Sequence, residues 1–160
     1  MIGRARVFGD DVNTDYIITS RRKCESLDPQ VLRHYLFEEI DPAFAKSVEP
    51  GDLIVAGKNF GCGSAMEVAV TAVVGAGIPA VLARSFSRTY YRNAVNNGLM
   101  PLICDTSRVR ESDRLVIAAQ SVHNQTTGEI IAVERLPKIM LDIIEAGGLV
   151  PYFQRHGRFP

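Results

Sequence analysis

The sequence predicts a single α/β domain over residues 1–160, in which short parallel strands alternate with helices and a β-rich segment follows. Two observations predict this class. Four-residue apolar runs, typical of buried strands, recur at residues 53–56, 80–83 and 101–104, with helix-like segments between them. A turn signal at residues 126–129 then precedes another apolar run. With 160 residues and 46% apolar content, the chain is long enough to bury one sizeable core.

The N-terminal part begins with a short predicted strand at residues 4–8. The following residues 8–18 contain glycine, asparagine and three aspartates, which indicates an Asx-rich loop. Asp28 and Pro29 are typical of the N-cap and first turn of a helix, which we expect to extend to about residue 39. A shorter helical piece is expected after it, before a turn that leads into the strand at 53–56.

Three adjacent cations, Arg21, Arg22 and Lys23, lie in the polar stretch after the Asx-rich loop. Runs of exposed charge are usually solvated, but three cations on a loop also suit an anionic ligand. Arg88 and Arg92 raise the same two interpretations, because their four-residue spacing places them on one face of the helix predicted to end near residue 97. The residue types alone leave both interpretations open.

The chain is organised around residues 57–77, where a glycine-rich turn follows a buried strand and precedes a helix. Ser64, with Glu67 three residues later, matches the S-x-x-E capping box, so we expect the helix to begin directly after Ser64. The residues that follow are apolar on every side, which predicts a buried helix that ends at Gly75 and Gly77.

Such a turn attracts anions, because bare backbone at Gly61 and Gly63 lets a carboxylate or phosphate approach the free N–H groups of the helix. It is neither a Walker loop nor a dinucleotide fingerprint, which would need glycine at position 66, where this chain has Met66. A tight strand-to-helix connection without a ligand is the equally open alternative.

The remaining elements complete the predicted domain. Strands are expected at residues 114–119 and 130–133, the latter in a hairpin, and a last helix at residues 138–146. Residues 151–160 are polar and basic, and we expect them to form a mobile tail.

Composition excludes several classes of protein. A formal net charge of zero disfavours nucleic-acid binding, and no apolar run has the length of a membrane span. Because no apolar leader follows Met1, we expect a cytoplasmic protein. The three cysteines, Cys24, Cys62 and Cys104, are odd in number and lack C-x-x-C spacing, which predicts free thiols and no metal site in this chain.

Five blocks occur in an order and at a spacing that resemble a known family. They are residues 9–18 (GDDVNTDYII), 57–64 (GKNFGCGS), 83–88 (ARSFSR), 91–99 (YRNAVNNGL) and 145–149 (EAGGL). Together they span nearly the whole chain, which resembles the small subunits of the 3-isopropylmalate dehydratase and homoaconitase group, relatives of aconitase. The resemblance implies a swivelling β/β/α domain as in the aconitase C-terminal domain.

The resemblance also implies an activity and its parts. It implies a hydro-lyase that isomerises or hydrates a substituted malate, as in leucine biosynthesis, on a small di- or tricarboxylic acid substrate. A large catalytic partner subunit would carry a [4Fe-4S] cluster as Lewis acid, with none of the cluster bound by this chain. Ser64 would be the catalytic base that takes a proton from carbon, and the N–H groups of Gly63 and Ser64 would hold substrate oxygens.

The chain departs from the family motif, GSSREHA, in which the first serine is the base. The residues here are Gly63, Ser64, Ala65, Met66, Glu67, Val68 and Ala69. A hydroxyl, a carboxylate-binding arginine and an imidazole are therefore missing, and such an arginine–carboxylate contact contributes about 1.5–3 kcal/mol.

The family loop after residue 18 helps to choose the substrate. There, Arg21 matches a common arginine, while Arg22 and Lys23 replace an aromatic and an apolar residue. We expect Arg22 or Lys23 to bind the substrate carboxylate that the missing motif arginine would otherwise hold, with Arg88 and Arg92 as further substrate-binding cations. The alternatives are a homoaconitase or other substituted-malate dehydratase small subunit, or a carboxylate-binding subunit without catalysis.

Overall fold

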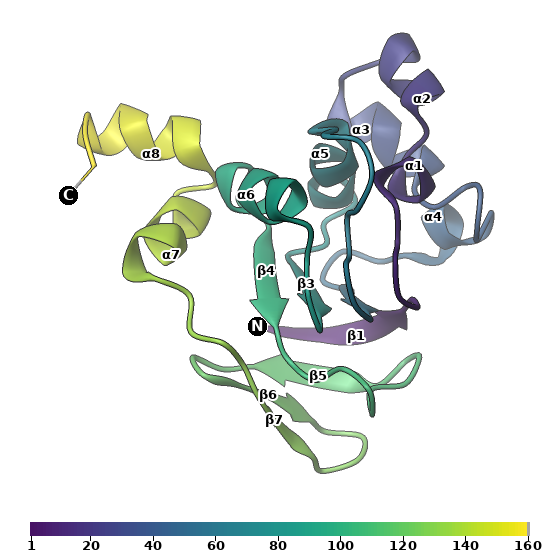
Figure 1. Cartoon of the computed structure of the whole chain (residues 1–160), viewed down its shortest axis with the longest axis vertical. Helices are drawn as coiled ribbons and strands as arrows, with labels where there is room; N and C mark the ends of the chain where they lie inside the picture. The colour runs from purple at the N-terminus through teal and green to yellow at the C-terminus, as the bar shows by residue number, and fades with distance from the viewer. Residues whose placement is uncertain (160) are drawn as a thin grey trace.

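The computed structural model describes residues 1–159 and contains one seven-stranded sheet with the strand order β4-β3-β2-β1-β5-β6-β7 (Figure 1). The strands are β1 (Ile2–Val7), β2 (Leu53–Ala56), β3 (Ala80–Ala83), β4 (Met100–Ile103), β5 (Arg114–Ile117), β6 (Ser121–Asn124) and β7 (Ile130–Ala132). Strands β1 to β4 are parallel, and β5 pairs with β1 in the antiparallel sense and continues as a meander. The predicted combination of parallel β-α units and a β-rich segment is confirmed.

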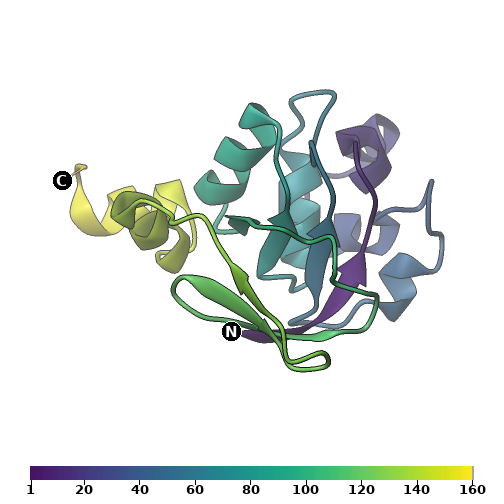
Figure 2. The same cartoon turned by 60° about the horizontal axis from the view of Figure 1, so that its bottom comes forward.

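The sheet curls until its two ends meet. Cys104, just after β4, forms an antiparallel bridge with Val133, just after β7, and the Glu134 N–H donates to the Ile103 carbonyl at 2.9 Å. Figure 2 shows the green β5–β7 meander below the parallel strands. The curl encloses one apolar core, and the two ends of the sheet touch just beyond β4 and β7.

The position of strand β2 between two apolar cores explains why its sequence is a continuous apolar run. Ile54 and Ala56 face one core, which the N-terminal helices cover, whereas Leu53 and Val55 face the core inside the curl. Because successive side chains of a strand alternate between faces, a strand buried on both sides needs apolar residues at every position.

Helices cover the outer face of the parallel strands and one flank of the sheet (Figure 1). The first group contains α1 (Thr14–Ile17), α2 (Ser20–Glu25), α3 (Pro29–Leu32), the 3-10 helix η1 (Arg33–Tyr35), α4 (Phe44–Ser47) and α5 (Val68–Gly75). The second contains α6 (Arg88–Asn96), α7 (Lys138–Glu145) and α8 (Leu149–His156). Helix α6 contacts α5 as well as α7 and α8, and so connects the two groups.

Several expectations about local structure need correction. The helix expected to reach residue 39 ends at Tyr35, and Phe37 has a positive φ of 56°, which a continuing helix does not allow. The polar stretch with three cations forms α2, and strand β6 was not predicted. The segment expected to be a mobile tail, residues 151–160, includes most of helix α8, which buries Tyr152 against Val95 and neighbouring apolar residues. Pro160 lies outside the described residues.

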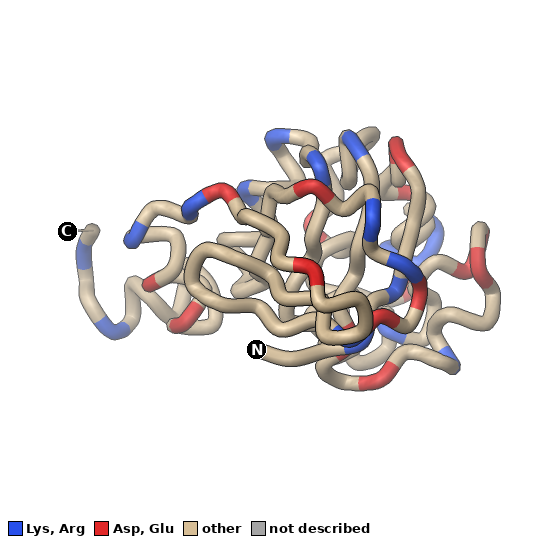
Figure 3. The backbone as a smooth tube through the Cα atoms, turned by 90° about the horizontal axis from the view of Figure 1, so that it is seen from below, with Lys and Arg blue, Asp and Glu red and all other residues tan. Residues whose placement is uncertain are grey.

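Charged residues of both signs are interspersed over the molecule, as Figure 3 shows in blue and red. Among residues 1–159, no helix is long and apolar enough to cross a membrane.

Candidate active site

Three loops leave the carboxyl ends of neighbouring parallel strands and run side by side. The loop after β2, here called the glycine loop (residues 57–67), lies between the loop after β1 (residues 8–13) and the loop after β3 (residues 84–87). Backbone hydrogen bonds join it to the first loop, from Gly57 to Gly9, from Asp11 to Lys58 and from Thr14 to Cys62. Backbone hydrogen bonds from Phe60 to Ser85 and from Ser87 to Phe60 join the glycine loop to the loop after β3. Ligands of open α/β sheets bind at this strand edge.

Ser64 lies exposed near the end of the glycine loop. Its carbonyl accepts a hydrogen bond of 2.9 Å from the Thr14 hydroxyl and another of 2.8 Å from the N–H of Met66. Within residues 1–159, no hydrogen bond occupies the Ser64 hydroxyl or the N–H groups of Gly63 and Ser64. These groups are available to a ligand, which is the property that an anion or an alkoxide needs.

The predicted capping box does not form. Helix α5 begins at Val68, its N-cap residue is Glu67, and no side chain accepts a hydrogen bond at that cap. The turn between Ser64 and Met66 uses the residues that a capping box would place in the first helical turn. Ser64 is therefore held by the loop and by Thr14, and its hydroxyl does not cap the helix. The helix itself is buried as predicted, with Val74 as an exposed exception.

The backbone conformation at position 63 and the nearby side chain of Asn13 both require a glycine there. Its φ is +94°, and a Cβ at this position would overlap the side chain of Asn13. Asn13 Oδ1 in turn accepts from the N–H of Asp15 at 2.9 Å and caps helix α1. The glycine therefore lets the glycine loop lie against the amide of Asn13.

The three positions that depart from the family motif present no polar side chain to the site. Met66 and Val68 are each 6% exposed and lie in the core beneath the helices, and Ala65 is exposed with only a methyl group. The only positively charged side chain of the glycine loop is therefore Lys58, which lies at the opposite end of the loop from Ser64.

The three cations after the Asx-rich loop differ in their surroundings. Arg22 donates to both oxygens of Glu38 at 2.9 Å and to Glu25 at 2.8 Å, and its guanidinium stacks 3.7 Å from the ring centre of Tyr35. These carboxylates raise the pKa of Arg22, and Arg22 in turn lowers the pKa of Glu38. Arg22 thus already has two carboxylate partners in the structure.

Arg21 and Lys23 remain exposed on α2. The Arg21 side chain is 69% exposed and only approaches Glu25, at 4.0 Å. Lys23 forms no ion pair with any residue in the range 1–159. Of the three adjacent cations, these two form no side-chain hydrogen bond within residues 1–159, whereas Arg22 uses three of its five N–H groups.

Arg88 and Arg92 are exposed on helix α6, whose start is tied to the glycine loop. The Ser87 hydroxyl caps α6 by accepting from the Tyr90 N–H at 3.2 Å, and it also donates to the Gly61 carbonyl at 2.6 Å. This double contact places Arg88 at the helix end that adjoins the glycine loop. Both arginines are free of ion pairs within the described part of the chain.

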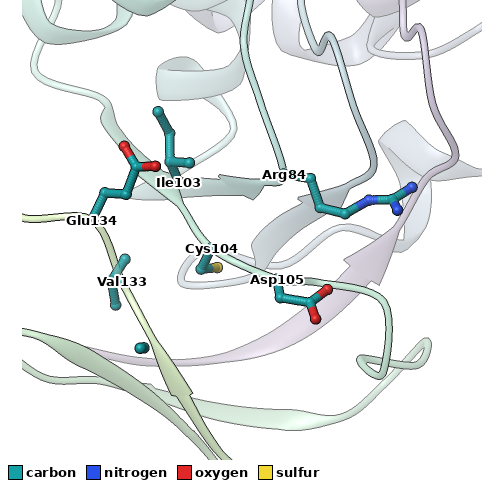
Figure 4. A pocket seen from close by; sticks show the side chains of 7 residues that line it. Arg84, Ile103, Cys104, Asp105, Val133 and Glu134 are labelled. Atoms are coloured by element: carbon teal, nitrogen blue, oxygen red, sulfur yellow. The ribbon is translucent and has the colours of Figure 1, made fainter.

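Four residues with structural roles at the site were missed from the sequence: Asn13, Thr14, Asp10 and Arg84. The first two contact Gly63 and Ser64, as described above. Arg84 Nη2 donates to Asp10 at 2.7 Å, and Arg84 also lines a pocket of about 460 Å³ next to Cys104, Asp105 and Glu134 (Figure 4). All four lie in conspicuous blocks of polar and glycine residues, but sequence spacing does not show which of these side chains meet.

The cysteines lie apart in different environments. Cys24 is exposed on α2, Cys62 is half-buried in the glycine loop, and Cys104 is buried after β4. Burial raises the pKa of the Cys62 thiol, with a contribution from Asp11, and burial raises the pKa of Cys104 to about 11. No three His, Cys, Asp or Glu side chains within residues 1–159 form a group that could hold a metal ion. The described residues of this chain therefore do not fit an iron–sulfur cluster.

Comparisons with known proteins cover nearly the whole chain. The Aconitase C-terminal domain family matches residues 25–107. A 3-isopropylmalate dehydratase small subunit 2 from Archaeoglobus fulgidus is 46% identical, over 98% of this chain and 96% of that protein. An isopropylmalate/citramalate isomerase small subunit from Methanocaldococcus jannaschii is 43% identical, over 96% and 93%.

Solved structures agree with these sequence matches. The crystal structure of a 3-isopropylmalate dehydratase from Methanocaldococcus jannaschii matches with a TM-score of 0.93 and 42% identity, over 98% of this chain and 96% of that one. Aconitase X from Thermococcus kodakaraensis matches with a TM-score of 0.52 and 12% identity, over 84% and 90%, and so resembles this chain in fold alone.

Proposed function

Because this chain belongs to the family of 3-isopropylmalate dehydratase small subunits, within the aconitase superfamily, we propose that it forms one subunit of a hydro-lyase of that type. The enzyme isomerises a substituted malate by removing and returning water, as in leucine biosynthesis. One relative is named for both isopropylmalate and citramalate, which supports substituted malates as the substrate class. Its place of action is proposed to be the cytoplasm.

The observation that carries the proposal is the exposed Ser64 beside two unoccupied backbone N–H groups, where three loops meet. Ser64 is proposed to be the base that removes the proton from the substrate carbon. An alkoxide needs donors that stabilise its negative charge, and preorganised N–H groups do this without rearrangement during the reaction. The N–H groups of Gly63 and Ser64 are proposed to serve the reacting oxygens in this way.

Substrate carboxylates are proposed to bind to the exposed cations on α2 and α6. Arg21, Lys23, Arg88 and Arg92 have free donors, and an ion-assisted hydrogen bond to a carboxylate is about twice as strong as a neutral one. Arg22 or Lys23 was predicted to bind the carboxylate that the missing motif arginine would hold, and Arg22 already bonds Glu38 and Glu25 through three of its five N–H groups. We therefore assign to Arg22 the positioning of α2, which carries Arg21 and Lys23.

The partner is proposed to be a large subunit that carries a [4Fe-4S] cluster. The described residues of this chain bring no cluster ligands together, so the proposal assigns the whole ligand set to that subunit. When bound there, the cluster would supply the Lewis acid for the substrate hydroxyl. This chain's part is to present Ser64 and the cations to the shared site.

A second function from a different class has one observation in its favour. Met66 and Val68 are buried and Ala65 has no functional group, so the loop lacks three side chains of the family motif. A carboxylate-binding subunit without catalysis would need the cations but not the base. The two functions differ in what happens when the Ser64 hydroxyl is removed.

The test is a Ser64→Ala variant, reconstituted anaerobically with the large subunit encoded in the same host. Dehydration of 3-isopropylmalate, citramalate and homocitrate is followed alongside binding of each acid. Ser121→Ala is the matched control, because its hydroxyl lies on the β5–β7 meander. We expect Ser64→Ala to lose turnover by about a hundredfold or more while binding persists and the control stays active. Binding without turnover by the wild-type complex for all three acids would favour the second function.

A further inference from the structure

The loops after β1, β2 and β3 meet at one carboxylate oxygen away from Ser64. Asp10 Oδ1 accepts a hydrogen bond of 2.7 Å from the Lys58 N–H and another of 2.7 Å from Arg84 Nη2. Gly57 lies against the same oxygen, because a Cβ at position 57 would overlap it. The Asp10 carboxylate therefore has its contacts only when all three loops hold their present positions.

Arg84 is held at both ends between these loops. Its N–H donates to the Gly57 carbonyl at 3.0 Å, and its guanidinium reaches Asp10. Figure 4 shows the side chain extending away from Glu134, which lines the same pocket. Its Nε is buried without a hydrogen-bond partner in residues 1–159, an arrangement that is unfavourable by itself.

The contacts beyond Asp10 continue step by step toward Ser64. They run from the Asp11 N–H to the Lys58 carbonyl at 2.8 Å, from the Gly61 N–H to the Val12 carbonyl at 2.8 Å, and from the Thr14 hydroxyl to the Ser64 carbonyl at 2.9 Å. Paired extended segments keep one register along their length, so a shift at the first contact displaces the last. The Asp10–Arg84 pair lies at the start of this series.

We propose that Asp10 and Arg84 are positioning residues for the Ser64 site, and that their ion pair sets the register of the glycine loop against its two neighbours. The catalytic consequence rests on the proposed function of Ser64. The structural consequence does not, because it concerns only this chain.

Amide hydrogen exchange of the isolated subunit tests the structural consequence. Arg84→Met removes the ion pair, Arg84→Lys keeps a cation, and Asp10→Asn keeps an oxygen for the Lys58 N–H without the charge. Arg108→Met is the matched control, since Arg108 pairs with Glu129 at 3.1 Å on the surface. We expect the Gly61 and Thr14 amides to exchange about tenfold faster in Arg84→Met and Asp10→Asn, but not in Arg84→Lys or the control. Faster exchange confined to Lys58 would overturn the proposal.

Kinetics of the reconstituted complex test the catalytic consequence. Misplacement of a reacting group lowers kcat, so we expect Arg84→Met to reduce kcat about tenfold or more with KM changed less than about threefold. Arg84→Lys should restore most of kcat, and the melting temperatures should remain similar. An unchanged kcat would refute a positioning role. If the wild-type complex lacks turnover, the proposed function fails, and the exchange experiment still decides whether the pair sets the register.

Discussion

The Thr14 hydroxyl donates a hydrogen bond of 2.9 Å to the Ser64 carbonyl, and the Thr14 N–H donates one of 2.8 Å to the Cys62 carbonyl. Thr14 is 2% exposed, so these contacts form in a place that water does not reach freely. One residue at the start of α1 thus holds the backbone on both sides of Gly63. The position of the proposed base depends on a side chain from a different loop.

We predict that Thr14→Val lowers kcat by about tenfold, because the Ser64 carbonyl loses one of its two donors, the one that ties it to another loop, and the base becomes mobile. The lost hydrogen bond should also reduce the free energy of unfolding by about 1 kcal/mol. Thr14→Ser keeps the hydroxyl and should behave as wild type. Steady-state kinetics and urea denaturation of the three proteins provide the measurement, and equal kcat values would show that Ser64 is held by other contacts.

Gly63→Ala should damage the site more severely than a nearby glycine change. A left-handed conformation costs a residue other than glycine about 1–3 kcal/mol, and the added methyl group would also overlap Asn13. We expect displacement of the glycine loop and a loss of turnover of about tenfold or more. Gly9→Ala is the control, because no atom lies within 4 Å of a Cβ there and its φ is not positive. Comparable activity of both variants would contradict this account.

Local patterns predicted the parallel strands well, because a strand buried on both faces needs an uninterrupted apolar run. β2 and β3 match the runs at residues 53–56 and 80–83 residue for residue. Strand β6 (Ser121–Asn124) was missed because its residues are mostly polar and half of them are exposed or partly exposed. Its strand conformation comes from pairing with β5 and β7, which local sequence does not encode.

In the candidate site, too, some features follow from local sequence and others only from contacts between distant residues. The glycine turn and Ser64 are readable because glycine and serine have strong local preferences. The capping box was wrong because the glycine loop takes three residues more than that motif needs before α5 begins at Val68. The contacts of Thr14 and Asp10 depend on three loops that are far apart in the sequence, and only the order of the strands brings them together.

The exposed cations on α2 should contribute to substrate binding more than to stability. We predict that the double variant Arg21→Gln and Lys23→Gln raises KM for a malate substrate about tenfold with little change in melting temperature. Arg108→Gln, which removes an exposed cation that pairs with Glu129, is the control for general loss of positive charge. Initial rates at several salt concentrations provide the measurement. A KM that is the same in the double variant and in wild type would remove α2 from the substrate site.

The Arg22–Glu38 pair should make stability depend on pH in acid. Arg22 lowers the pKa of Glu38 below its usual 4.5, so ionisation of this carboxylate is more favourable in the folded state than in the unfolded state. The pair therefore contributes its full stability above about pH 4.5 and loses it as the pH falls through the lower folded pKa. Glu38→Gln cannot ionise and lacks this contribution at every pH.

We predict that wild type exceeds Glu38→Gln in free energy of unfolding by about 1 kcal/mol at neutral pH, since the pair is bidentate and partly buried. The difference should shrink below about pH 4. Urea denaturation of both proteins across this range gives the two curves. Because Arg22 also holds α2 through Glu38, Glu38→Gln should raise KM as well, through movement of Arg21 and Lys23. A constant difference in stability at all pH values would mean that Glu38 acts through packing and not through its charge.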